Sequence, residues 1–103
     1  MTKQAISDLQ NLEHNAEQAV TMLKMLANKH RLMLLCLLQA GEQSVSQLNQ
    51  QVVIPQSTLS QHLAFLRQTN LVSTRRQGQT IFYALKDPNV TPIIAVLQQL
   101  YCP

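Results

Sequence analysis

The sequence predicts a mainly α-helical domain with one small β-hairpin near its C-terminal end. The chain has 103 residues, which gives room for one domain spanning residues 1–103. Hydrophobic residues make up 46% of it but aromatic residues only 4%, which favours an aliphatic core between packed helices. Four segments with helix-spaced apolar residues precede residue 70, and two alternating segments flank Gly78. A fifth helical segment follows the hairpin.

The first helix is expected to be long and amphipathic, and the second to be shorter and more apolar. Ser7 and Gln10 have the spacing of a capping box, so the first helix is expected to begin near Ser7, with residues 1–6 disordered. Asn28 interrupts the helical pattern, and a second helix is expected from Lys29 to Gln39. This second helix is apolar nearly all round, which predicts a central position in the fold. The apolar stripe of the first helix consists of Leu9, Leu12, Ala16, Val20, Leu23 and Ala27.

Residues 44–69 have the pattern of a helix-turn-helix. Ser44 is expected to cap a short helix, and Pro55 prevents that helix from continuing because the residue before a proline avoids helical geometry. Ser57 is expected to cap the next helix, which is predicted to end near Thr69. Two short helices joined by a tight turn form this motif. The expected buried stripe of the second of them is Leu59, Leu63 and Leu66.

Residues 71–85 are predicted to form a hairpin, and residues 91–102 a final helix. The two strands flank Gly78, and Ile81, Tyr83 and Leu85 alternate toward one face. A hairpin that follows a helix-turn-helix is a wing. Pro92 fits the first turn of the last helix, where its missing N–H group costs little. The predicted order α-α-α-α-β-β-α is that of a winged helix-turn-helix.

The helix after Pro55 is expected to read DNA, because its exposed face carries hydroxyl and amide side chains and no carboxylate. Such groups both donate and accept hydrogen bonds, as base edges in the major groove require. Residues 43–86 contain four basic residues and no acid, whereas the first 42 residues balance four acids against four bases. A basic segment without carboxylates favours a polyanion as partner, the alternative being chance in a weakly charged protein.

The expected DNA contacts divide between this helix and the wing. Ser60, Gln61 and Ala64 are expected to read bases, while Arg67, Arg75 and Arg76 hold phosphates. The full set expected in the helix is Gln56, Ser57, Thr58, Ser60, Gln61, His62, Ala64, Arg67 and Gln68. The full set expected around the tip of the wing is Arg75, Arg76, Gln77, Gln79 and Thr80.

The first and last helices lie outside this unit and are the expected surface of a homodimer. Two-fold symmetric half-sites in DNA require a two-fold symmetric protein. The alternative is that their apolar stripes pack only within one chain. The expected interface residues are Leu12, Ala16, Val20, Ile93, Ile94, Leu97, Leu100 and Tyr101.

Other classes of function find little support in the sequence. No apolar run approaches the roughly 20 residues of a membrane span, and the N-terminal residues do not resemble a signal peptide, so a cytoplasmic location is expected. His14, His30 and His62 lack metal-ligand spacing, and no cofactor is expected. No histidine or acid stands in motif relation to a cysteine, which argues against a thiol enzyme such as a sulfur transferase. A pure protein-interaction module would keep the apolar stripes but has no need of an acid-free helix and wing.

The order of elements resembles the ArsR/SmtB family of winged-helix regulators, from about residue 16 to the end. Residues 26–32, Leu-Ala-Asn-Lys-His-Arg-Leu, resemble the entry to its second helix, and residues 56–67 resemble its recognition helix. The resemblance implies a dimer that binds operator DNA and releases it when an inducer changes the dimer. The metal sites of the family use a Cys-x-Cys pair in the third helix or Asp and His in the last helix. The corresponding segments here lack these ligands, so no metal is expected.

The two cysteines are the remaining chemical feature. Taken alone, Cys36 is best explained as a small hydrophobic residue of an apolar segment. Cys102, beside the C-terminus, does not by itself indicate a function. Within the family, however, residues 34–36 together with residues 100–103 resemble the thiol-based sulfide and persulfide sensors of the BigR, SqrR and YgaV type, with HlyU nearby. This resemblance implies that Cys36 and Cys102 are paired sensing thiols, that reactive sulfur species are the inducer, and that their cross-linking releases DNA. A general peroxide-type thiol switch and an anti-silencing activator of the HlyU type are the alternatives.

Overall fold

Five helices and three short strands build the computed structural model, which describes residues 3–102. In order, they are α1 (Lys3–Leu26), α2 (Lys29–Leu38), β1 (Gln43–Ser44), α3 (Val45–Gln51), α4 (Gln56–Gln68), β2 (Val72–Gln77), β3 (Thr80–Leu85) and α5 (Val90–Tyr101). The predicted winged helix-turn-helix is confirmed, with β1 as an unpredicted addition. Two residues are too short a segment to show any periodicity. None of the helices described is long and apolar enough to cross a membrane.

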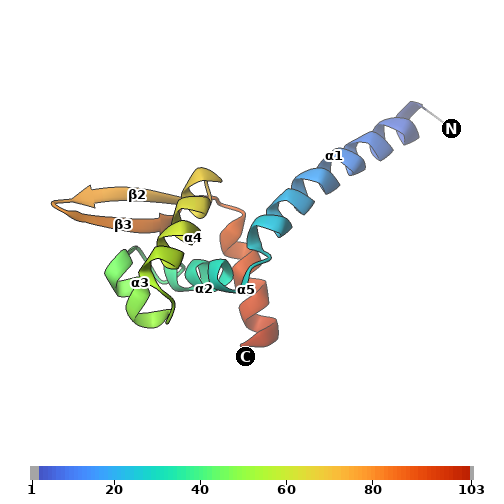
Figure 1. Ribbon diagram of the computed structural model, residues 1–103. Coiled ribbons are helices and arrows are strands. Elements are labelled where there is room, and N and C mark those ends of the chain that lie inside the picture. Colours follow the sequence, from blue (N-terminus) through green and yellow to red (C-terminus); the bar gives the residue numbers. More distant parts are fainter. Residues whose placement is uncertain (1–2, 103) are drawn as a thin grey trace.

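α1 projects away from the rest of the molecule, and the wing extends on the opposite side (Figure 1). The helix begins at Lys3, so the prediction of disorder is wrong for residues 3–6, while residues 1 and 2 lie outside the described part. Ser7 is therefore inside the helix and is not its cap. No glycine or proline precedes Ser7 to stop the helix from extending toward the N-terminus.

The core lies where α2, α3, α4 and α5 meet the base of the wing. Leu34, Leu35 and Leu38 of α2 are buried, as expected for the central helix. The predicted stripe of α4, Leu59, Leu63 and Leu66, is also buried completely. Asn28 begins α2, since its side chain accepts hydrogen bonds from the backbone N–H groups of His30 and Arg31.

Two caps and one turn determine how the helix-turn-helix joins the wing. Ser44 and Gln47 form a capping box at α3, as the sequence suggested for Ser44. α4 begins one residue before the predicted Ser57, after Pro55, whose φ of −55° suits a helix start. At the other end Asn70 adopts a φ of +63°, and the N–H of Leu71 donates to the carbonyl of Leu66 at 2.9 Å. This is a Schellman turn built on asparagine instead of glycine.

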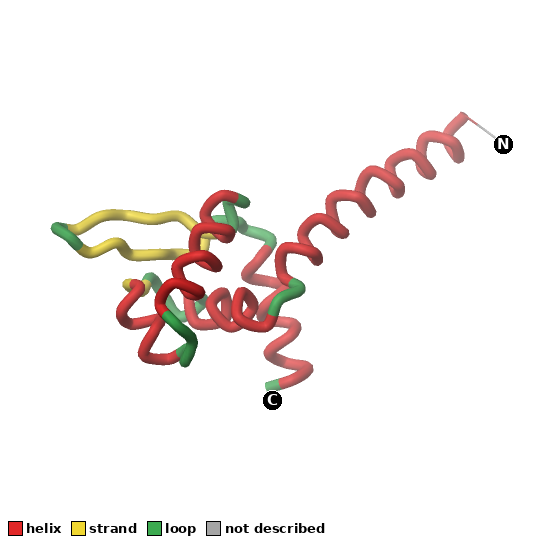
Figure 2. Tube along the Cα trace, in the orientation of Figure 1, coloured by secondary structure: helices red, strands yellow, loops and turns green. Residues whose placement is uncertain are grey.

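The sheet is antiparallel in the order β1-β3-β2, and its long hairpin forms the wing (Figure 2). Arg75 lies opposite Phe82, and Arg76 lies opposite Ile81. Tyr83 and Leu85 pack against the core as predicted, but Ile81 does not and is 38% exposed. Ile81 pairs with Arg76 next to the last pair before the turn. The hairpin extends past the helices at its base (Figure 2).

Candidate nucleic-acid interface and thiol pair

The outer face of α4 is polar and uncharged except for Arg67. Burial of the leucine stripe turns the opposite side of the helix to solvent. The side chains of Thr58 and His62 are half-buried at its flanks. The predicted residues that the structure leaves exposed on this face are Gln56, Ser57, Ser60, Gln61, Ala64, Arg67 and Gln68. Hydroxyls, amides and one cation on a protruding helix can bond to base edges and phosphates without a competing carboxylate.

His62 faces α2 and lies beside a second histidine. The ring centroids of His62 and His30 are 5.8 Å apart, with the rings tilted by 42°. Burial lowers the pKa of His62, and the nearby charges of His30 and Arg31 lower it further. His62 is therefore held at the boundary between α2 and α4 as a neutral ring near neutral pH.

The two wing arginines lie on opposite faces of the hairpin and have different partners. Arg75 binds Glu42 through its Nε, at 2.9 and 2.8 Å from the two carboxylate oxygens, and through a second guanidinium nitrogen. The same guanidinium lies 4.5 Å from the centroid of the Phe82 ring. The hydrogen bond from Arg75 lowers the pKa of Glu42. Arg76 instead donates to the carbonyl of Gly78 at 3.2 Å.

This arrangement gives Arg75 a carboxylate partner that competes with a DNA phosphate. The acid-free stretch begins at Gln43, and Glu42, one residue earlier, supplies the carboxylate that Arg75 binds. Glu42 belongs to the first 42 residues, in which acids and bases balance. Because β1 pairs with β3 of the wing, Glu42 lies beside Arg75 in the folded chain. The remaining wing residues predicted to contact DNA, Gln77, Gln79 and Thr80, are exposed near the tip.

An open cleft separates the wing from the start of the helix-turn-helix. None of its lining residues is charged. They are Ser44, Val45, Ser46, Asn49, Gln56, Gln79, Thr80 and Ile81. Gln56, the first residue of α4, lines this cleft, and α4 begins without a side-chain cap. Ser46 and Asn49 line this cleft, although no sequence pattern predicted a role for them.

The two cysteines lie close enough for their charges to interact. Cys36 is half-buried in α2, and Cys102 is exposed where α5 ends, with its N–H bonded to the carbonyl of Gln98. α2 and α5 pack against each other. Burial raises the pKa of the Cys36 thiol, and the charge of Cys102 raises it further. The raised pKa keeps the Cys36 thiol protonated at neutral pH. Both cysteines are free in this structure.

The predicted dimer residues divide between exposed and buried positions. Leu12, Ala16, Val20, Leu100 and Tyr101 are exposed, and Ile93 and Leu97 are half-buried. Ile94 is an exception: it is 0% exposed and belongs to the core of its own chain, so its place in a dimer surface is wrong. α5 has two apolar faces. One contains Ile94 and packs against the core, and the other contains Leu100 and is exposed. Leu9, Leu23 and Val96 are further exposed apolar residues of this surface.

Within residues 8–102, no three histidine, cysteine or acidic side chains gather as metal ligands would. The chemical features of the described residues are therefore the polar face of α4, Arg76 on the wing, which no carboxylate binds, and the two thiols. None of these groups forms a catalytic arrangement of nucleophile, base and oxyanion donors.

Comparison with known proteins agrees with this description. Residues 28–74 match the family described as "Bacterial regulatory protein, arsR family". The chain is 46% identical to the transcriptional activator HlyU of Vibrio cholerae over 97% of this chain and 93% of the relative. It is 40% identical to the biofilm growth-associated repressor of Xylella fastidiosa, covering 90% and 82% of the two chains. The crystal structure of HlyU from Vibrio vulnificus superimposes with a TM-score of 0.88 at 45% identity, over 92% and 99% of the chains.

These relatives are DNA-binding transcriptional regulators and not enzymes, and homodimers are typical of the family. The identity extends over nearly the full length of both chains, so it includes the helices outside the DNA-reading unit. The chain belongs to the arsR family of winged-helix transcriptional regulators.

Proposed function

We propose that this regulator is a homodimeric, operator-binding repressor that reactive sulfur species inactivate through Cys36 and Cys102. The observation that carries the proposal is the placement of the two thiols on helices that pack against each other, one half-buried in α2 and one exposed at the end of α5. A bond between them would join a central helix of the DNA-reading unit to a helix with an exposed apolar face.

The proposed DNA contacts are the exposed residues of α4 and one face of the wing. Ser60, Gln61 and Ala64 would read base edges in the major groove, with Arg67 on a phosphate. Arg76 would supply the wing contact, since Arg75 is engaged by Glu42. A dimer through α1 and α5 would place two such units on a symmetric operator.

The proposed chemistry begins at Cys102, because the exposed thiol meets a dissolved reagent first. Its thiolate attacks an inorganic polysulfide, one S–S bond breaks, and the shortened fragment leaves as hydrosulfide or a shorter polysulfide. Cys36 then loses its proton and attacks the sulfur chain on Cys102, which expels the terminal sulfur as hydrosulfide. The two thiols lose two electrons, the polysulfide gains them, and a bridge with added sulfur joins the cysteines.

Added sulfur matters because a simple disulfide has strict geometry. It requires Cα atoms about 4.4–6.8 Å apart, and each further S–S bond adds about 2 Å of reach. A bridge with added sulfur could close over a separation at which peroxide would form a strained bond. Selectivity for polysulfide over peroxide would then be geometric. Closing the bridge would pull α5 against α2 and change the spacing of the two recognition helices in the dimer.

The test treats the reduced protein with either inorganic polysulfide or hydrogen peroxide, then measures mass and binding to its own promoter DNA. We expect polysulfide to give a Cys36–Cys102 link with added sulfur and to abolish DNA binding, and peroxide to do neither. Cys36→Ser and Cys102→Ser should each keep DNA affinity and lose the response. Separately modified thiols with DNA release intact would contradict the cross-link, and equal release by peroxide would indicate a general redox switch.

The Vibrio cholerae relative is named a transcriptional activator, which favours activation of transcription as a second candidate. In the anti-silencing form that the resemblance to HlyU implies, the regulator would displace another DNA-binding protein that silences the promoter. Transcription in vitro with purified polymerase separates the two. A repressor lowers transcription in the absence of any other protein, whereas an anti-silencer has an effect only when the silencer is present.

A further inference from the structure

The orientation of α1 relative to the DNA-reading unit depends on few contacts. α1 leaves the body of the molecule at its last turns, where Leu26 is buried and Met22 and Met25 pack against the core (Figure 1). The rest of the helix contributes an apolar stripe that is exposed in the single chain. Small changes at this junction therefore move a long arm.

Arg31, in the first turn of α2, holds that junction by hydrogen bonds. Its Nε donates to the carbonyl of Met25 at 2.8 Å, and a terminal nitrogen donates to that of Lys24 at 3.2 Å. Carbonyls in the last turn of a helix have no partner within the helix, and a cation is favourable there. Within residues 8–102, the hydrogen bonds that join α1 to another helix or strand both come from Arg31.

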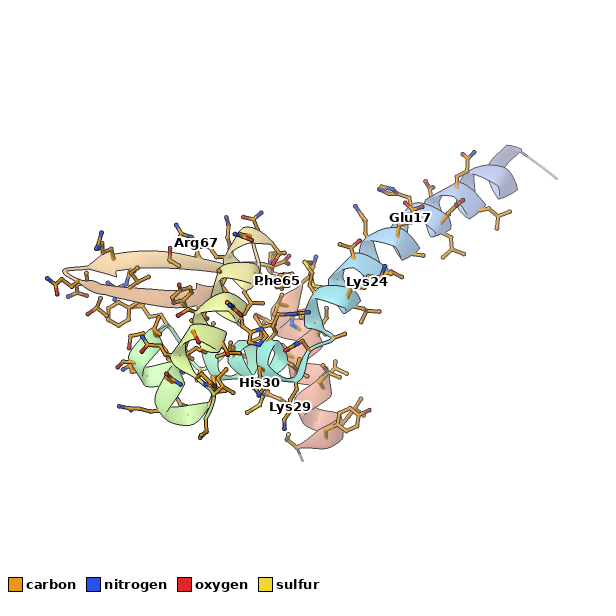
Figure 3. The ribbon with its side chains drawn as sticks, viewed as in Figure 1. Glu17, Lys24, Lys29, His30, Phe65 and Arg67 are labelled. Atoms are coloured by element: carbon orange, nitrogen blue, oxygen red, sulfur yellow. The ribbon has the colours of Figure 1, made fainter. Side chains whose placement is uncertain are left out.

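The same guanidinium also contacts the recognition helix. Its central carbon lies 4.2 Å from the centroid of the Phe65 ring, the geometry of a cation–π interaction. Phe65 is half-buried in α4, one residue after Ala64 of the exposed face, and Figure 3 labels it near Lys24 at the end of α1. The Asn28 side chain fixes the base of Arg31 by accepting from its backbone N–H at 3.1 Å.

We propose that Arg31 is the positioning residue that fixes the angle between α1 and the recognition helix, and so the spacing of the two recognition helices in a dimer. A planar guanidinium is suited to this role, because one face stacks on a ring while its edge donates to carbonyls. Rotation of α1 breaks either the carbonyl bonds or the ring contact. The inference rests on the proposed dimer through α1 and is independent of sulfur sensing.

The experiment compares three kinds of DNA with reduced protein. The first is a duplex carrying the inverted repeat that the unaltered protein selects from random-sequence DNA. The second is a single half-site cut from it, and the third is a series in which the half-sites are moved apart or together by single base pairs. For Arg31→Met we expect affinity for the full site to fall about tenfold, a loss within the range of a partly buried cation–π contact. Affinity for the half-site should change less than about twofold, and the preference for one spacing should flatten.

Lys29→Met is the matched control, because it removes one positive charge from the same turn of α2 at an exposed position. It should lower full-site and half-site affinity equally and leave the spacing preference intact. Arg31→Lys keeps the charge without the planar fork, and Phe65→Leu removes only the ring. Both should flatten the spacing preference, and they keep the test decisive if Arg31→Met does not fold.

Equal losses on full and half-sites in these variants, or a sharp spacing preference in all of them, would overturn the role of Arg31. A different result would refute the proposed dimer itself: unaltered protein that binds full and half-sites with the same affinity and shows no spacing preference. Unaltered protein that shows the spacing preference but does not respond to polysulfide would contradict the proposed sulfur sensing and not the role of Arg31.

Discussion

α1 and α4 are both amphipathic helices, but only α4 buries its apolar stripe within the chain. Leu63 of α4 is 0% exposed, while Leu12 of α1 is 65% exposed. The face that α4 leaves in solvent is polar, and the face that α1 leaves in solvent is apolar. The DNA-reading unit is thus complete in one subunit, whereas α1 is incomplete until another surface covers it. Regulation through the incomplete part can alter DNA binding without unfolding the part that reads DNA.

The largest effect should follow from damaging the complete unit. We expect Leu63→Ala to lower the free energy of unfolding by about 2–5 kcal/mol, the cost of a cavity in a packed core. Leu12→Ala should leave the unfolding of the subunit nearly unchanged in dilute protein. Urea denaturation followed by circular dichroism measures both. A large loss for Leu12→Ala at low protein concentration would mean that α1 packs within its own chain.

The next largest effect should come from placing a charge on the incomplete surface. Leu12→Asp introduces a carboxylate that a dimer would have to bury, and we expect the dimer to dissociate. Analytical ultracentrifugation should show a monomer with native circular dichroism. Glu13→Gln, which alters an exposed residue next to it, is the control and should stay dimeric. A dimer that survives Leu12→Asp would move the interface to α5 alone.

Within the complete unit, the two wing arginines should differ in their contribution to DNA binding. The slope of log affinity against log salt is negative, and removing one phosphate contact makes it less steep by about 0.9. We expect Arg76→Ala to do so and Arg75→Ala to leave the slope nearly unchanged, because Glu42 already neutralises Arg75. Glu42→Gln should make the slope steeper, because it releases Arg75 to bind a phosphate. Titrations at several salt concentrations measure it, and a larger effect for Arg75→Ala than for Arg76→Ala would reverse the assignment.

The smallest effect should be a pH dependence confined to the complete unit. The pKa of His62 is lower in the folded protein than its ordinary value of 6.5, so the unfolded chain binds the proton more readily. Stability should be highest above pH 6.5 and fall as the pH drops below it. His62→Gln should weaken this dependence, whereas His14→Gln, on exposed α1, should not. The same loss of pH dependence in both variants would contradict the placement of His62.

Local patterns predicted most of the fold, and long-range contacts account for what they missed. The stripe of α4, the Ser44 cap and the all-apolar α2 are set by neighbours in sequence, and all were predicted. The pairing of Glu42 with Arg75 joins residues 33 apart, and the Arg31 contact with Phe65 joins residues 34 apart, so no local period signals either. Ile94 was misplaced because periodicity marks an apolar face without saying which surface covers it. The roles in DNA binding and sulfur sensing remain predictions.

The Schellman turn at Asn70 has a consequence for the whole DNA-reading unit. It joins the end of α4 to Leu71, which is buried, and the carbonyl of Leu71 accepts the N–H of Lys86 where β3 ends. These hydrogen bonds connect α4 and the wing rigidly at the base of the wing. A change in the orientation of α1 or α5 should therefore rotate α4 and the wing through the same angle. The contacts of α4 in the major groove and the contacts of the wing should then be lost in a single step, without a state in which only one of them binds DNA.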